Sequence, residues 1–129
     1  MSGCQLELVD SRIANWQIKL PDTIADNASS ARVIVSEQIT RLDGLDLAAE
    51  TVTLTRNGVA VGSGDGAAVL GHPAEAVAWL ANKLAEYDIA LMAGQLILPG
   101  AMCAAATVSA SETYRAAFST IGEVSVRFA

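Results

Sequence analysis

The stretch that decides the fold is residues 66–87, which read GAAVLGHPAEAVAWLANKLAEY. Pro73 suits the first turn of a helix, where a missing N–H leaves no hydrogen bond unmade, and it favours an extended, capping conformation for His72. The apolar positions that recur at helical spacing are Val77, Leu80, Ala81 and Leu84. We therefore predict one long helix over about residues 73–87, with this apolar face packed into the core.

The segments on both sides of this helix have the patterns of strands and turns. Asn57-Gly58 supplies the two positive-φ residues of a type I′ turn and so predicts a hairpin over residues 51–64. In the register that this turn sets, Leu54 faces Val61. The side chains expected on the buried face of the hairpin are Val52, Leu54, Val59 and Val61.

Further strands are expected near both ends of the chain. Residues 5–9 and 31–38 are short apolar runs, and alternating patterns predict strands over 113–118 and 123–128 with a turn near 119–122. Strands and hairpins around one helix indicate an α+β, mainly β, roll-like architecture. No repeat or linker divides the chain, so we expect a single domain over its 129 residues.

Composition and charge exclude several classes of function. The 14 acidic and 8 basic residues give a net charge of −6, which disfavours nucleic acid and anionic membrane surfaces as partners. Cys4 and Cys103 have neither metal-ligand spacing nor a disulfide framework, and the N-terminus has no secretory signal. These features favour a cytoplasmic protein. The uncharged gap between Asp88 and Glu112 is broken by glycine and proline, and residues 95–98 are expected to be a buried strand rather than part of a membrane span.

Two local motifs have both a functional and a structural interpretation. Residues 62–67, GSGDGA, contain Gly-x-Gly-x-x-Ala after a strand, as in dinucleotide-binding proteins, but the predicted helix begins too late to meet a pyrophosphate there. We favour glycines that permit a bulge or close packing. His72 is the single histidine, and we favour helix capping over catalysis for it.

The densest polar group in this apolar sequence lies between residues 7 and 30. Carboxylate oxygens suit Mg²⁺, and a neighbouring lysine can hold a substrate anion or move a proton. Short polar residues also make turns, and composition alone favours that plainer interpretation. The members of the group are Glu7, Asp10, Lys19, Asp22, Asp26, Asn27, Ser29 and Ser30.

Residues 5–30, QLELVDSRIANWQIKLPDTIADNASS, closely resemble the 2-keto-4-pentenoate hydratase family of the fumarylacetoacetate hydrolase superfamily. The resemblance continues through GAAVLGHP at 66–73, ILPGA at 97–101 and GEVSVRF at 122–128. It covers nearly the whole chain but only the C-terminal half of such an enzyme. The implied fold is the mixed β-sandwich roll of that half, with the long helix near 73–87.

The resemblance also implies a site. Family members bind Mg²⁺ or Mn²⁺ through an upstream Glu-x-Glu pair and a third acid, which Glu7 matches; this sequence contains no Glu-x-Glu pair. Lys19 matches the active-site lysine of the superfamily. Asp26, Asn27 and Ser29 are expected to lie beside the carboxylate and keto oxygens of the substrate.

The implied activity is a hydro-lyase of aromatic meta-cleavage catabolism. Such an enzyme adds water to 2-hydroxypenta-2,4-dienoate, with a metal ion stabilising the enolised 2-oxo acid. Within the family, 4-oxalocrotonate decarboxylase is the alternative. The alternative from a different class of function is that the chain is a truncated or separately encoded half, which is inactive alone and acts as a binding or assembly module. We predict a homo-oligomer or a complementing N-terminal half, since the strand over residues 5–9 otherwise leaves a free edge.

Overall fold

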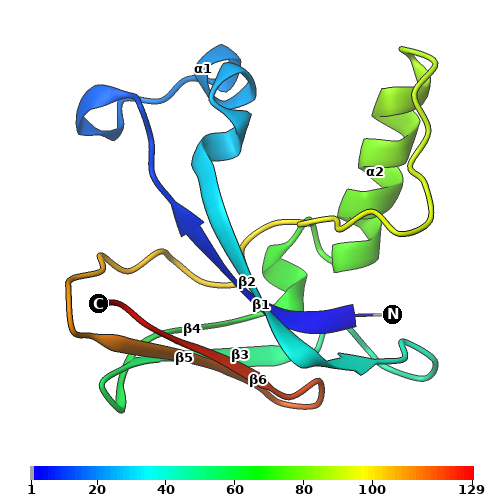
Figure 1. Ribbon diagram of the computed structural model, residues 1–129. Helices are drawn as coiled ribbons and strands as arrows, with labels where there is room; N and C mark the ends of the chain where they lie inside the picture. Colours follow the sequence, from blue (N-terminus) through cyan, green and yellow to red (C-terminus); the bar gives the residue numbers. More distant parts are fainter. Residues whose placement is uncertain (1) are drawn as a thin grey trace.

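The computed structural model describes residues 2–129 (Figure 1). Its strands are β1 (Ser2–Val9), β2 (Ser30–Thr40), β3 (Thr51–Arg56), β4 (Val59–Asp65), β5 (Thr113–Phe118) and β6 (Glu123–Arg127). Its α-helices are α1 (Leu20–Ala25) and α2 (Pro73–Ala85), and its 3₁₀ turns are η1 (Ala14–Trp16), η2 (Asn27–Ser29) and η3 (Gly66–Ala68). The expectation of a mainly β fold with one long helix is confirmed.

The strands form two antiparallel sheets. β1 pairs with β2 in a two-stranded ribbon, and the second sheet has the order β4-β3-β5-β6. One end of the ribbon packs over β5 and β6, where the buried Cys4 thiol donates a hydrogen bond to the carbonyl oxygen of Ile121 at 3.2 Å. The core cluster between the sheets is Cys4, Val52, Leu54, Tyr114, Ala116, Ile121 and Val124. The other end of the ribbon carries residues 10–29, which we call the head.

The predicted hairpin is correct at its turn and wrong in its register. Asn57 and Gly58 have φ of 50° and 84°, as a type I′ turn requires. A bulge after Leu54 then pairs that residue with Gly62 instead of Val61. The bulge leaves Val61 without a partner on β3, and Val61 is 38% exposed rather than buried. Val59 keeps Arg56, the partner that the turn sets, and is 68% exposed near the tip of the hairpin.

The glycine motif of β4 has the packing role that we favoured. A Cβ on Gly64 would lie 1.9 Å from the carbonyl oxygen of Met102, and a Cβ on Gly66 would lie 1.7 Å from that of Leu47. Real Cβ atoms do not approach other atoms so closely. The glycines therefore leave room for the two backbone segments that contain Met102 and Leu47 to pass close to them.

α2 begins as predicted, because the His72 Nδ1 atom accepts a hydrogen bond from the Ala74 N–H at 3.0 Å. The prediction that the helix packs into the core is wrong. Its one buried residue is Ala76, and Trp79 is 60% exposed. Figure 1 shows α2 standing away from the sheets, with the following segment returning alongside it. The core is closed instead by the ribbon and by residues 102–108.

A smaller expectation also fails. Residues 95–98 form no strand, and Leu96 is 60% exposed. Near the other end of the chain, Asn15 and Trp16 both have left-handed φ of 56°, and Trp16 is 58% exposed. Within residues 2–129, no helix is both long and apolar enough to cross a bilayer.

Candidate active site

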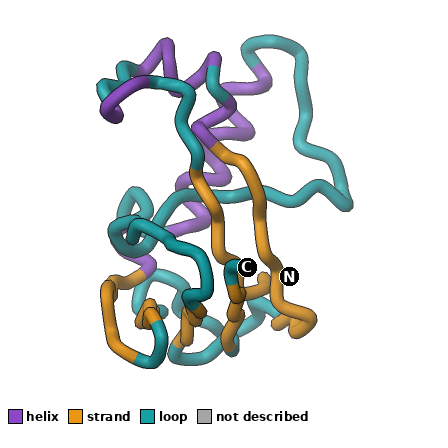
Figure 2. The backbone as a smooth tube through the Cα atoms, turned by 60° about the vertical axis from the view of Figure 1, so that its left-hand side comes forward, coloured by secondary structure: helices purple, strands orange, loops and turns teal. Residues whose placement is uncertain are grey.

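The head is an excursion between two paired strands. The pair Val9–Ser30 ends the ribbon, and beyond it the Asp10 N–H donates to the Ser29 carbonyl oxygen at 2.8 Å. Figure 2 shows that the head and α2 lie at one end of the molecule and the four-stranded sheet at the other. Of the residues expected to act at the site, Glu7 thus lies on the ribbon and the others lie in the head, at the end of the ribbon away from the core.

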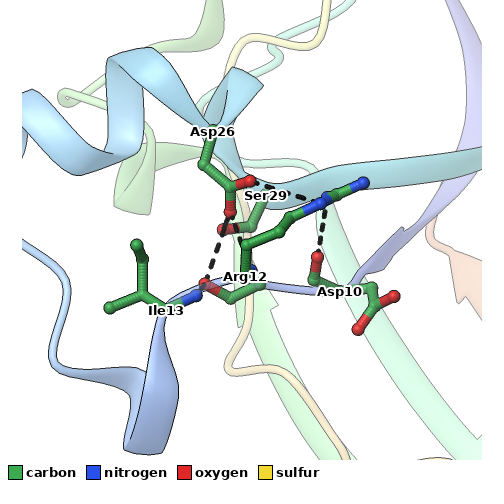
Figure 3. A network of polar contacts seen from close by, with 6 residues as sticks. Asp10, Arg12, Ile13, Asp26 and Ser29 are labelled. Carbon is green, nitrogen blue, oxygen red and sulfur yellow. Dashed lines mark hydrogen bonds and ion pairs between the residues drawn. The ribbon is translucent and has the colours of Figure 1, made fainter.

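Asp26 is the centre of a polar network inside the head (Figure 3). Its Oδ2 atom accepts hydrogen bonds from the Ser29 hydroxyl at 2.7 Å, the Arg12 backbone N–H at 3.2 Å and the Ser11 hydroxyl at 3.4 Å. The Arg12 Nε atom lies 3.5 Å from Oδ1. The bond from Ser29, aided by Arg12, holds the pKa of Asp26 below its ordinary value. An ionised carboxylate thus joins the beginning of the head to its end.

The turn that follows Asp26 has an unusual backbone. Asn27, Ala28 and Ser29 have φ of 51°, 56° and 57°, three consecutive left-handed residues without a glycine. Such conformations cost energy for L-residues and persist where surrounding contacts impose them. Ser29 is 3% exposed and directed to Asp26, whereas Asn27 is exposed. The network therefore holds a strained turn in which Asn27 is exposed to solvent.

Lys19 and Glu7 are both exposed. Lys19 is the N-cap of α1, where the Asp22 carboxylate accepts its backbone N–H at 3.0 Å; the described residues place no acid in an ion pair with its ammonium. Glu7 pairs with Val33 on the ribbon. The neighbouring residue Leu6 packs against the core cluster, and because successive side chains of a strand point to opposite faces, Glu7 points away from the core. The structure brings Asp26 and Ser29 into contact but shows no contact joining Glu7, Lys19 and Asn27.

Sequence reasoning missed Arg12 and Ser11 as partners of Asp26. Nothing in their spacing signals the pairing, because the contact depends on how the head folds back over the ribbon end. The left-handed turn after Asp26 was partly predictable at Asn27, since asparagine tolerates left-handed backbone, but nothing about Ala28 predicts it.

Comparison with known proteins gives one consistent result. No family model matches the chain. It is 44% identical to the 2-hydroxyhexa-2,4-dienoate hydratase of Comamonas testosteroni, with 95% of this chain and 46% of that protein covered. It is 41% identical to the 2-keto-4-pentenoate hydratase of Burkholderia vietnamiensis and to the 4-oxalocrotonate decarboxylase of Pseudomonas putida, each covering 95% of this chain and 47% of the relative. The chain thus spans about half the length of the curated relatives it matches.

Solved structures agree with the sequence relatives. The 4-oxalocrotonate decarboxylase from Pseudomonas putida G7, complexed with magnesium and adipate, superposes with a TM-score of 0.93 at 38% identity over 98% of this chain and 48% of the decarboxylase. The complex of that enzyme with calcium and acetate gives 0.89.

The ribbon, head, four-stranded sheet and long helix define a domain of the fumarylacetoacetate hydrolase type. Within that superfamily, the chain matches the C-terminal half of the 2-keto-4-pentenoate hydratase family.

Proposed function

We propose that this chain is one half of a cytoplasmic hydro-lyase that adds water to a short 2-hydroxy dienoic acid such as 2-hydroxypenta-2,4-dienoate. The observation that carries the proposal is its identity of 39% to 44% with curated dienoate hydratases over almost its full length. Residues 1–129 would act as a single hydratase-like domain. Its partner would be a second polypeptide segment that completes the site.

Different residues of the head would have different roles. The exposed ammonium of Lys19 is suited to holding the substrate anion or transferring a proton. Asn27 presents its amide to solvent and is suited to hydrogen-bonding a substrate oxygen. Asp26 and Ser29, which bond to each other, would act by holding the turn that carries Asn27.

The residues of this chain do not by themselves fit a divalent metal ion. Among residues 2–129 there is no cluster of three or more His, Cys, Asp or Glu that could hold one. Glu7 offers a single exposed carboxylate, whereas Mg²⁺ needs several oxygen ligands. We propose Glu7 as one ligand of a Mg²⁺ or Mn²⁺ ion whose other protein ligands lie outside these residues.

A decarboxylase is the second candidate. It is favoured by the TM-score of 0.93 with a 4-oxalocrotonate decarboxylase. Product analysis separates the two activities: the hydratase proposal requires a hydroxylated 2-oxo acid with no loss of carbon, and the alternative requires release of CO₂ from a dicarboxylic substrate.

The proposal is tested by the loss of dienoate absorbance in Mg²⁺ or Mn²⁺ buffer. The chain is assayed alone and co-expressed with the N-terminal half of the Comamonas testosteroni hydratase. We expect turnover from the co-expressed pair, its loss in Glu7→Ala, and no change in Glu37→Ala, which removes another exposed acid of the ribbon. A co-purified pair without turnover, or full activity in Glu7→Ala, contradicts the proposal.

A further inference from the structure

Asn57 joins the turn of the β3–β4 hairpin to the neighbouring strand β5. Its backbone N–H donates to the carbonyl oxygen of Thr113 at 2.8 Å, and its side-chain Oδ1 atom accepts the Thr113 N–H at 2.9 Å. These two bonds extend the β3–β5 ladder beyond its last pair, Arg56 and Tyr114. Both Asn57 and the following residue, Gly58, are exposed to solvent. The turn is thus fixed to the sheet at a point that water reaches.

Gly58 is the feature that makes this asparagine reactive. A glycine has no side chain that hinders the approach of its own nitrogen to another group. A Cβ on Gly58 would have nothing within 4 Å, so the turn is open on that side. Within residues 2–129, the Gly58 N–H donates to no acceptor. Its nitrogen is therefore free to act as a nucleophile towards the side-chain amide carbon of Asn57.

The other asparagines of the chain separate the effect of glycine from those of exposure and backbone conformation. Asn15, Asn27 and Asn82 are also exposed. Asn15 and Asn27 have left-handed φ of 56° and 51°, close to the 50° of Asn57. The residues that follow these three asparagines are tryptophan, alanine and lysine, respectively. Asn57 differs from all of them in the small residue that follows it.

We propose that Asn57 is a site of spontaneous deamidation and that its side-chain hydrogen bond to Thr113 limits the rate. The Gly58 nitrogen attacks Cγ of Asn57, the carbon–nitrogen bond of the side-chain amide breaks, and the leaving nitrogen takes the Gly58 proton to become ammonia. The product is a five-membered cyclic imide. Water opens this ring at either carbonyl, giving aspartate or isoaspartate. Overall, asparagine and water become an acid and ammonia, with no oxidation or reduction.

The hydrogen bond opposes ring closure because it holds the reacting amide towards β5. To reach the Gly58 nitrogen, the Asn57 side chain turns away from β5, and the Thr113 N–H loses its acceptor. One hydrogen bond of this kind slows the reaction roughly fivefold. The isoaspartate product adds one carbon to the backbone of a two-residue turn, a length that type I′ geometry does not allow. Conversion should therefore release the end of the hairpin from β5.

The test of the site is incubation of the purified full chain in mildly alkaline buffer, followed by digestion after glutamate and mass spectrometry. The resulting peptide 51–75 contains Asn57 and no other asparagine. We expect its deamidation to be at least about tenfold faster than that of Asn15, Asn27 and Asn82, since a bulkier following residue keeps the nitrogen from the attacking distance. Enzymatic methyl transfer to the product identifies isoaspartate.

The test of the hydrogen bond is Thr113→Pro, which removes the N–H that Asn57 accepts and keeps the carbonyl to which Asn57 donates. Proline is tolerated at the first residue of a strand, which Thr113 is in β5. We expect deamidation of Asn57 to become roughly fivefold faster. Thr113→Val is the matched control, because it keeps the N–H, and its rate should equal that of the parent. If circular dichroism shows that Thr113→Pro unfolds, the parent is compared with and without urea, and the unfolded chain should react faster.

The outcomes bear on the two parts of the proposal separately. Deamidation of Asn57 no faster than that of the other three asparagines overturns the site. Equal rates in the parent and in folded Thr113→Pro overturn the role of the hydrogen bond, as do equal rates with and without urea where that comparison is used. Reaction concentrated at Asn57 and accelerated by Thr113→Pro supports both parts. None of these measurements depends on dienoate turnover, so they hold whether or not the proposed activity is found.

Discussion

Glu50 shows how a single carboxylate can hold a fold together. Its side chain is 4% exposed and accepts hydrogen bonds from the Thr120 N–H at 2.8 Å, the Ile121 N–H at 3.4 Å and the Thr120 hydroxyl. Burial by itself raises the pKa of Glu50, but these hydrogen bonds outweigh it, and the pKa lies below its ordinary value. The carboxylate thus fixes the turn between β5 and β6.

Glu50→Gln should lower the free energy of unfolding by about 2 kcal/mol, because an amide group cannot accept every bond that the carboxylate accepts. Urea denaturation monitored by circular dichroism measures the effect. Glu37→Gln, a substitution at an exposed position of β2, should change stability by less than about 0.5 kcal/mol. Equal losses in the two variants would disprove this role of Glu50.

The lowered pKa of Glu50 also predicts how stability depends on pH. Because the folded pKa is below the unfolded one, the stabilisation is complete above the ordinary carboxyl pKa of about 4.3 and is lost as pH falls from there through the lower folded pKa. The urea midpoints of the parent and Glu50→Gln should therefore draw closer as the pH is lowered from neutral into that acid range. Parallel curves would show that Glu50 is not responsible.

Asp26→Ala should loosen the head without unfolding the sheets, because the network joins Ser11, Arg12 and Ser29 and contributes nothing to the core cluster. Amide hydrogen exchange should accelerate about tenfold or more in residues 10–13 and 27–29. Amides of β3 serve as the internal control and should keep their protection. Unchanged exchange in the head would contradict the positioning role of Asp26.

At the scale of elements, local chemistry could be predicted and long-range contacts could not. The Asn57-Gly58 turn and the His72-Pro73 helix start depend on neighbouring residues, and both are confirmed. The bulge after Leu54 changes the register within the hairpin, and no residue of the turn predicts it. The position of α2 could not be predicted either, because an apolar stripe indicates that a helix face is covered but not which segment covers it.

The glycines of β4 and η3 allow a sharp test at this scale. Gly64→Ala and Gly66→Ala should each cost about 1–3 kcal/mol or more, because the added methyl meets a backbone carbonyl. Gly62→Ala is the control, since its nearest neighbours would lie 3.8 Å away. Thermal unfolding of the three variants compares them. A similar loss in all three would indicate a general strand effect instead of close packing.

At the scale of the whole molecule, the sequence resembled half of a hydratase, and the comparisons agree over 95% of the chain and less than half of the relatives. The strand that carries Glu7 could be predicted from its short apolar run, whereas helix α1, of which Lys19 is the N-cap, could not. How their side chains would meet a substrate could not be predicted, because the described residues show no contact that joins Glu7 and Lys19.

The most direct test of the central claim, that this chain supplies one side of a shared dienoate hydratase site, is the initial rate of dienoate loss by the co-purified complex carrying Lys19→Ala. We expect a rate about 10²–10⁴-fold below that of the parent complex, as for a lost proton-transfer group, with unchanged complex mass. A Lys19→Ala complex as fast as the parent would contradict it.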